Sequence, residues 1–217
     1  IYEEKHGGPG GEYIKDVVYG ANDGIITTFA VVSGVAGASL QNYIVLILGF
    51  ANLLADAVSM AVGNYLGTKS ELEYIKKERK REEWEIEHYP KGEIEEIREI
   101  YKKKGFKGKD LEKAVKIIIS DKSVWVDTMM TDELGLYNTE GVSPVKKGLA
   151  TFIAFVAAGV VPLLAYVIPG IEMSRFVVYI ILTGFIMYGV GSLRTLITGR
   201  NWFIAGMEML IVAGLAA

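Results

Sequence analysis

A chain of 217 residues with 51% hydrophobic residues and a net charge of -3 is long enough for one globular domain, but its charge is not spread as in a soluble protein. The segment from Glu71 to Glu140 holds 18 of the 26 acidic residues and most of the basic ones. The absence of cysteine excludes disulfides and thiolate metal sites, so any metal must be held by oxygen, imidazole or thioether groups. The pattern predicts apolar membrane spans around a charged insert, and nothing in it indicates a nucleic-acid partner.

The first span is predicted to begin near Val17, after a Gly-rich lead. Asp23 lies inside this span, and Gly20-x-x-x-Gly24 is a spacing that lets another helix approach closely. The chain does not begin with Met and ends in apolar sequence at Ala217, so we expect the natural protein to run further at one or both ends.

The second span is predicted from Tyr43 to about Leu66, and its polar residues share one helix face because they recur every fourth position. These residues are Asn52, Asp56, Met60 and Asn64. A carboxylate inside an apolar stretch of this length is costly, which makes Asp56 a candidate for an ion or proton path. Gly63-x-x-x-Gly67 predicts a second close helix contact. The polar face continues beyond the membrane, so we expect one helix to contain the whole run from 52 to 85.

The charged insert follows, and breaks at Pro90-Lys91-Gly92, at Gly105 to Gly108 and after Gly135 divide it into helices. The predicted helices are Ser70 to His88, Glu93 to Lys104, Asp110 to Ser120 and Ser123 to Leu136.

Three more apolar segments come after the insert: Gly148 to Pro169, Phe176 to Leu193, and Trp202 to Ala217. Each has close to the length that a span requires, with Pro162 expected to kink the first of them. We therefore predict an all-α integral membrane protein with five transmembrane helices. Its domains would be residues 1–67 (spans one and two), 68–147 (helical cytoplasmic metal-binding insert between spans two and three) and 148–217 (spans three to five).

Basic residues near the span ends lie almost entirely on one side of this arrangement, with Arg175 alone on the other side. They are Lys5, Lys15, Lys69, Lys76, Lys77, Arg79, Lys80, Arg81, Lys146, Lys147, Arg194 and Arg200. The positive-inside rule then predicts a cytoplasmic N-terminus and insert, with the C-terminus on the opposite side.

Three sets of residues in the insert are spaced to share a helix face, and together they are candidate metal ligands. They are Glu82 with Glu85, Glu93 with Glu96, and Met129 and Met130 with Glu133. Any one pair is more simply a solvated helix surface, and the methionines could be core filler. Three sets together favour a metal site, where thioether ligands would indicate a late transition metal over magnesium or calcium.

Two further sets of candidates lie elsewhere in the sequence. Glu85-x-x-His88 resembles half of a di-iron motif, but the other histidine, His6, lies in the Gly-rich lead without a Glu three residues before it. Within the apolar segments, Asp23 is a candidate ion ligand, and Asp56 and Glu208 are candidate proton relays, each with a hydrogen-bonded structural carboxyl as the alternative. The sequence has no Walker loop or nucleophile elbow, so we predict neither an enzyme nor ATP-driven transport.

Several ordered motifs, covering nearly the whole chain from Tyr13, resemble the vacuolar iron transporter family. They are DVVYGANDGIITTFAVVSGVAG, ADAVSMAVGNYL, KREEWEIE, MMTDELGL and GMEML. The resemblance implies a five-span homodimer that moves ferrous iron out of the cytoplasm in exchange for protons, along a path between the two first spans. It implies Asp23 and Met60 as membrane ligands, and a metal-binding domain made by Glu82, Glu85, Glu93, Glu96, Met129, Met130 and Glu133. Asn64 stands where many members of the family have Glu.

The predicted function is therefore export of divalent metal from the cytoplasm, with Fe2+ as the main ion and Mn2+, Zn2+ and Co2+ as further candidates. The expected partners are membrane lipid, metal ions, protons and a second copy of the chain, without a prosthetic group. The Lys-, Ile- and Glu-rich composition predicts a prokaryotic cell membrane. The alternative is a membrane-anchored metal buffer or a ferritin-like di-iron oxidase that transports nothing.

Overall fold

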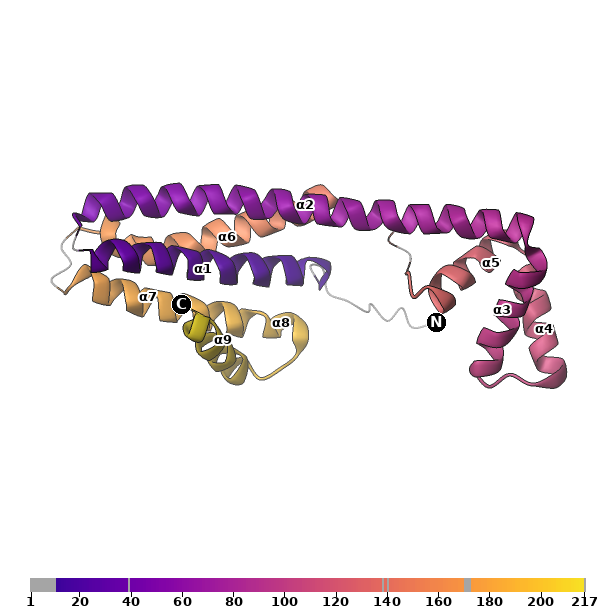
Figure 1. Ribbon diagram of the computed structural model, residues 1–217. Coiled ribbons are helices and arrows are strands. Elements are labelled where there is room, and N and C mark those ends of the chain that lie inside the picture. Colours follow the sequence, from indigo (N-terminus) through magenta and orange to yellow (C-terminus); the bar gives the residue numbers. More distant parts are fainter. Residues whose placement is uncertain (1–10, 39, 138, 140, 170–172, 217) are drawn as a thin grey trace. The chain divides into compact units, whose positions relative to one another are not determined.

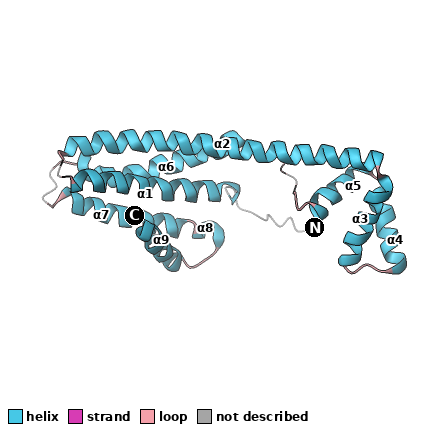
Figure 2. Cartoon of the chain, viewed as in Figure 1, coloured by secondary structure: helices cyan, strands magenta, loops and turns pink. Residues whose placement is uncertain are grey.

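The computed structural model describes residues 11–216 except 39, 138, 140 and 170–172, and within these ranges all regular structure is helical (Figure 2). The predicted all-α class is confirmed. The elements are a 3-10 turn Gly11–Tyr13, α1 Ile14–Gly37, α2 Asn42–His88, α3 Pro90–Lys103, α4 Gly108–Ile119, α5 Lys122–Thr128, a π-helical segment Met129–Glu133, α6 Pro144–Val167, α7 Arg175–Leu193, α8 Thr195–Thr198 and α9 Trp202–Ala216 (Figure 1).

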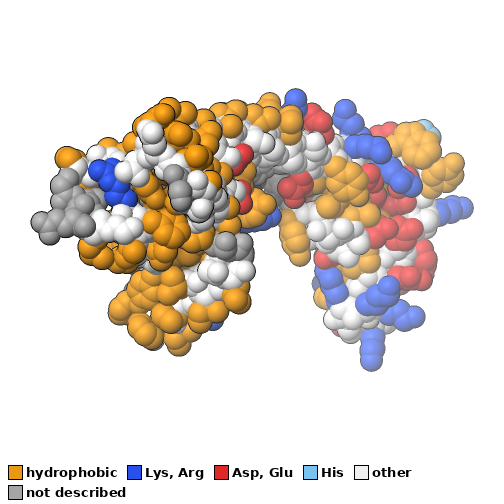
Figure 3. Space-filling model, turned by 60° about the vertical axis from the view of Figure 1, so that its left-hand side comes forward, with side chains coloured by type: hydrophobic (Ala, Val, Ile, Leu, Met, Phe, Trp, Pro, Cys, Tyr) orange, Lys and Arg blue, Asp and Glu red, His pale blue; other side chains and the backbone are white. Residues whose placement is uncertain are grey.

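The chain forms two compact units. The first comprises the chain up to Leu66 together with Ser143 onward, and the second comprises Gly67–Val142. Helix α2 contributes to both, and it contains the whole run 52–85 as predicted. In Figure 3, hydrophobic side chains cover much of the visible face of the first unit, whereas charged side chains gather on the second.

The first unit is held together by close packing of α1 on α6, with α7 on α6 and α9 on α7 (Figure 1). Its main core joins residues of α1, α2, α6 and α7, among them Val32, Leu53, Phe155 and Tyr179, all 1% exposed or less. Gly24 allows α1 and α6 to pack closely, because a Cβ at this position would lie 2.4 Å from the carbonyl oxygen of Phe155. The close helix contact predicted at Gly20-x-x-x-Gly24 is thus made within the chain, between α1 and α6.

The contact predicted at Gly63-x-x-x-Gly67 is absent among the described residues, since a Cβ added to either glycine would have no neighbouring atom within 4 Å. The close approach between α2 and α6 is made instead at Gly148, where a Cβ would lie 2.7 Å from the carbonyl oxygen of Ala61. The glycine that allows this contact therefore lies on α6, and a motif on α2 alone does not indicate it.

These two kinds of glycine give a matched test of the packing. We expect Gly24→Ala to lower the free energy of unfolding by about 1–3 kcal/mol, because its Cβ would overlap the backbone of α6. Gly63→Ala should be neutral or stabilising by up to about 1 kcal/mol, because it adds helix propensity in open space. Thermal unfolding of both variants in mild detergent measures the difference. Equal melting temperatures would contradict the packing of α1 on α6.

By length and hydropathy, three helices in the described part of the chain are apolar enough to cross a membrane: α2, α6, and the stretch Arg175–Thr198 that contains α7. Helix α6 continues through Pro162, which is buried. Helix α1 has 24 residues but carries Asp16 and Asp23 in its first half, and α9 is a shorter apolar helix. The structure is thus compatible with a membrane protein.

The second unit packs the end of α2, α3, α4 and α5 around an apolar cluster that includes Ile86, Ile97, Val115 and Val126. Two predicted boundaries in this unit were wrong. The sequence Pro90-Lys91-Gly92 is the first turn of α3 and not a break, since proline is well accommodated where its missing N–H is not needed. The last predicted helix is interrupted, because α5 ends at Thr128 and a π-helical segment follows it.

Candidate metal centre

Three elements of the second unit bring five glutamates together. Glu82 and Glu85 lie on one face of α2, Glu93 and Glu96 lie on α3, and Glu133 ends the π-helical segment. Each of them interacts electrostatically with at least two of the others. The carboxylates of the three predicted sets therefore lie near one another. Short π-helical segments are often found at functional sites, since the extra residue changes the direction of the side chains.

Two of these carboxylates are buried at a cost. Glu82 is 4% exposed and Glu93 is 6% exposed, and each has an Oε2 atom without a hydrogen-bond partner among the described residues. A buried carboxylate without a partner is unfavourable, so its position needs a compensating ligand. A divalent cation supplies both the opposite charge and the missing contact.

The burial and mutual repulsion of these glutamates raise the pKa of three of them. Burial, followed by the charges of Glu133, Glu85 and Glu96, raises the pKa of Glu82 to about 7. Burial and the charges of neighbouring glutamates likewise raise the pKa of Glu93 to about 7, and burial raises the pKa of Glu133. Near neutral pH the cluster therefore exchanges protons readily, and a cation that binds there displaces them.

The side chains are not arranged as a finished cage. Among the described residues, no group of three or more His, Asp or Glu side chains is placed to hold one ion. Like charges move apart when nothing cationic lies between them. Arg81, whose Nε donates to Glu85 Oε1 at 3.1 Å, supplies part of the balancing positive charge.

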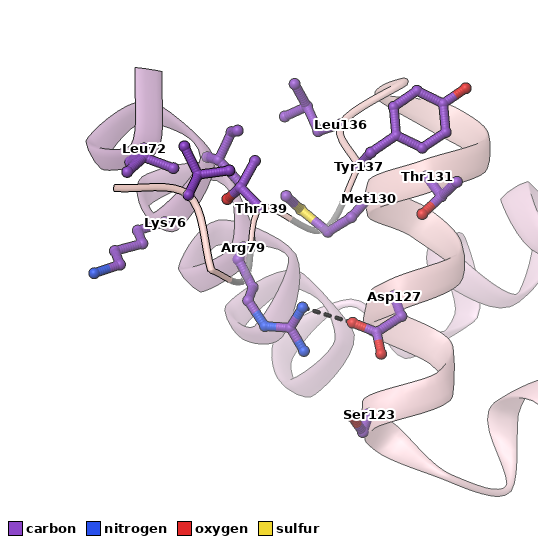
Figure 4. Close-up of a pocket in the computed structure, with 12 residues that line it drawn as sticks. Leu72, Lys76, Arg79, Ser123, Asp127, Met130, Thr131, Leu136, Tyr137 and Thr139 are labelled. Atoms are coloured by element: carbon purple, nitrogen blue, oxygen red, sulfur yellow. Dashed lines mark hydrogen bonds and ion pairs between the residues drawn. The ribbon is translucent and has the colours of Figure 1, made fainter. Parts of the chain in front are cut away.

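The two methionines are placed differently from the glutamates. Met129 is fully buried in the apolar cluster of the second unit, and Met130 is 4% exposed. Met130 also lines a cavity of about 690 Å³ (Figure 4), in which Arg79 Nη1 donates to Asp127 Oδ1 at 2.6 Å. None of the five glutamates lines this cavity. The methionine side chains thus lie within apolar packing, and their role as ligands stays a prediction.

His88 does not take part in the cluster. Its ring stacks on Trp84 with centroids 4.4 Å apart, and its Nδ1 donates to the Trp84 carbonyl at 2.8 Å. His6, the other histidine, lies outside the described residues. Within the described part of the chain, nothing supports the second half of a di-iron motif.

The first unit holds a second group of candidates. The carboxylates of Asp23 on α1 and Asp56 on α2 lie close enough to repel each other. Asn52 Nδ2 donates to Asp56 Oδ2 at 2.9 Å, whereas the Asp23 carboxylate has no hydrogen-bond partner among the described residues. Met60 is partly buried one turn after Asp56. The stripe on α2 therefore does face the acidic residue of α1, as an ion site between them requires.

Glu208 is engaged elsewhere. Arg194 Nη2 donates to its Oε2 at 2.6 Å, and Arg200 Nη1 donates to the same atom at 3.3 Å. Two guanidinium groups thus contact one carboxylate oxygen, so Glu208 takes part in an ion-pair network. The structure brings it together with arginines and not with the other two candidate carboxylates.

A polar cluster at the start of α1 was not predicted from the sequence. Asp16 is 5% exposed and accepts a 2.9 Å hydrogen bond from Asn64 Nδ2, which also donates to Thr151 Oγ1 at 2.7 Å. The cluster connects α1, α2 and α6. Asp16 precedes Asp23 by seven residues and so shares its face of α1, which is the signal that could have identified it. Asn64 thus acts as a donor to a carboxylate.

Comparison with known proteins identifies the family. The VIT family model matches residues 14–217. A vacuolar iron transporter of Toxoplasma gondii is 42% identical over 168 residues, covering 76% of this chain and 56% of that protein, so the chain spans little more than half of that relative. One of Plasmodium berghei is 33% identical over 214 residues, covering 94% and 78%. Vacuolar iron transporter 1 of Arabidopsis thaliana is 31% identical over 216 residues, covering 100% and 86%.

These relatives are named as transporters, in agreement with the prediction that the chain is not an enzyme. The match extends over almost all of the described residues, including both groups of candidate ligands. The resemblance inferred from the motifs is therefore confirmed, and the chain belongs to the VIT family.

Proposed function

We propose that this chain exports ferrous iron from the cytoplasm through a five-span membrane unit, in exchange for protons. The observation that carries the proposal is that Asp23 on α1 and Asp56 on α2 lie close enough to repel each other inside the apolar first unit, where ionisable groups are functional by default. Helices α1 and α9 would add two spans to the three helices that meet both the length and the hydropathy criteria. The names of the relatives support iron as the cargo, and Mn2+, Zn2+ and Co2+ are further candidates.

The glutamate cluster would collect metal before transport, with Met129 and Met130 adding preference for transition metals. The basic residues near the span ends support a cytoplasmic N-terminus and insert. The relatives named above come from eukaryotes, so a prokaryotic membrane stays a prediction.

The mechanism uses one carboxylate in turn for two ions. Asp23 would hold a proton when no metal is bound and release it when Fe2+ arrives, because a divalent cation and a proton compete for the same oxygens. Met60 would add a soft ligand, and Asp56 would pass protons along α2. Exchange of metal for protons then needs no further energy source than the proton gradient.

Metal accumulation in sealed proteoliposomes tests transport directly. We expect Fe2+ to enter vesicles that contain the full chain and not vesicles without it, with Mn2+ carried more slowly. Binding to the protein without accumulation inside the vesicles would favour a membrane-anchored metal buffer. Oxidation of Fe2+ without accumulation would favour the di-iron oxidase instead.

We also propose a homodimer with α1 at its centre. Gly34 and Gly37 are exposed, and a Cβ added to either would have no neighbouring atom within 4 Å, so a second helix can approach them closely. In this cysteine-free chain, a cysteine at Gly34 or Gly37 should crosslink to its symmetry mate, whereas one at the buried Val32 or Val35 should not. Equal crosslinking at all four positions, or a monomeric mass in bilayers, would refute this arrangement.

A further inference from the structure

A groove of about 340 Å³ in the first unit lies between the start of α1 and helix α9, and the proposed transport path does not use it. Its charged lining residues are Lys15, Arg194 and Glu208. Its apolar wall includes Val18, Met209 and Val212. The groove therefore combines a polar end with an apolar side.

The polar end carries excess positive charge. Glu208 is shared between Arg194 and Arg200, so one carboxylate faces two guanidinium groups. Lys15 is exposed and has no partner among the described residues. Its neighbour Asp16 does not neutralise it, because that carboxylate is buried and accepts from Asn64. Lys15 and Arg194 line the groove and Arg200 contacts the same Glu208, so the polar end carries more positive than negative charge, which an anionic ligand would reduce.

Aromatic residues beside the groove are typical of the headgroup level of a bilayer. Tyr19, which lines the groove, is 65% exposed, and Trp202 at the start of α9 is 59% exposed. The Trp202 ring packs edge-on against Tyr188, with centroids 6.2 Å apart. Tyrosine and tryptophan gather where a protein surface passes from hydrocarbon to headgroups. The cations of the groove therefore lie where lipid phosphates are found.

We propose that this groove binds one anionic phospholipid, with the phosphate at the polar end beside Lys15 and the two arginines that contact Glu208, and an acyl chain along Val212. A zwitterionic lipid would leave the excess positive charge of the polar end unchanged, whereas an anionic headgroup lowers it. A soluble anion would leave the apolar wall without a ligand. A second copy of the chain would have to supply carboxylates here, and among the described residues the exposed surface of the first unit has few.

Native mass spectrometry of the full chain in mild detergent tests this, with phosphatidylglycerol and phosphatidylcholine of identical acyl chains as probes. We expect one tightly bound phosphatidylglycerol per chain and clearly weaker phosphatidylcholine. Lys15→Gln with Arg200→Gln should weaken phosphatidylglycerol binding about 25-fold, since each basic group near an anionic headgroup contributes about fivefold. Val212→Trp, which fills the groove and leaves the charges unchanged, should also remove the bound lipid.

The matched control removes two charges elsewhere. Lys69→Gln with Lys146→Gln lowers the net charge equally at exposed sites outside the groove and should leave the bound lipid in place. Equal binding of the two lipids, or equal losses in both double variants, would mean that cations attract lipid without a site, and would overturn the proposal. The proposal would also be overturned if the parent protein showed no lipid adduct and Val212→Trp converted a dimer to a monomer. The groove would then be a protein interface.

Discussion

We expect Asp23→Asn to slow metal flux into proteoliposomes by more than about 100-fold, because it removes the charge of a carboxylate on α1 that has no hydrogen-bond partner among the described residues. Loss of groups that only orient a metal ligand costs about 10–100-fold, so loss of a carboxylate that is proposed to be the ligand itself should cost at least as much. The substitution keeps the size and the partly buried position of the side chain. Folding should therefore be preserved while the charge that attracts a divalent cation is lost.

Two comparisons make this result specific. Asp56→Asn should slow transport less, because Asn52 already donates to Asp56 and the role proposed for Asp56 is to pass protons. Metal binding by the glutamate cluster in the second unit should be unchanged in both variants. If Asp23→Asn vesicles accumulate Fe2+ at the rate of the parent protein, the path does not include this residue, and Asp16 would be the next carboxylate to test.

The second large effect concerns Glu82 and Glu93. We expect Glu82→Gln with Glu93→Gln to weaken metal binding by the second unit about 100-fold, since two buried carboxylates of the proposed site are lost. The same variant should be more stable than the parent protein without metal at pH 8, by about 1–2 kcal/mol, because it no longer buries two charges without partners. Residues that only hold the fold together would not give these opposite results.

The pH dependence follows from the direction of the pKa shifts. A carboxyl whose pKa is raised from 4.5 to about 7 on folding stabilises the folded state below pH 4.5, and this contribution is lost as pH rises through about 7. The metal-free parent protein should therefore lose stability between pH 5 and pH 8, and Fe2+ should restore it. The double variant should show a flatter profile, whereas Glu71→Gln with Glu99→Gln, two exposed positions, should behave as the parent. A flat profile in the parent would contradict the burial of these groups.

The fold could be predicted largely from the sequence because apolar periodicity and charge are so strongly separated along this chain. The long helix α2 follows from four polar residues at a spacing of four, and the helices after the insert follow from their uninterrupted apolar runs. What the sequence could not determine is which surfaces meet. Gly63 and Gly148 are both small residues in helices, and only their surroundings show that the second packs against the backbone of α2.

The same distinction holds for the candidate sites. Spacing placed pairs of glutamates on helix faces, and their convergence depends on how α3 packs against the other helices of the second unit. From the sequence, Glu208 and Asp23 are equally good candidates for an ion or proton path, since each is a carboxylate in an apolar segment. Its engagement with two arginines fourteen and eight residues earlier required the turn through α8. Asp16 was overlooked because its partner Asn64 is 48 residues away.

Coupled measurement of metal and protons in one vesicle preparation tests the central claim most directly. The full chain is reconstituted with a pH indicator and a metal indicator inside the vesicles, and Fe2+ is added outside at equal pH on both sides. Metal-for-proton exchange predicts that the interior becomes more alkaline as Fe2+ enters, and that Asp23→Asn abolishes both signals together. Entry of Fe2+ at the full rate without any change of internal pH would contradict the account.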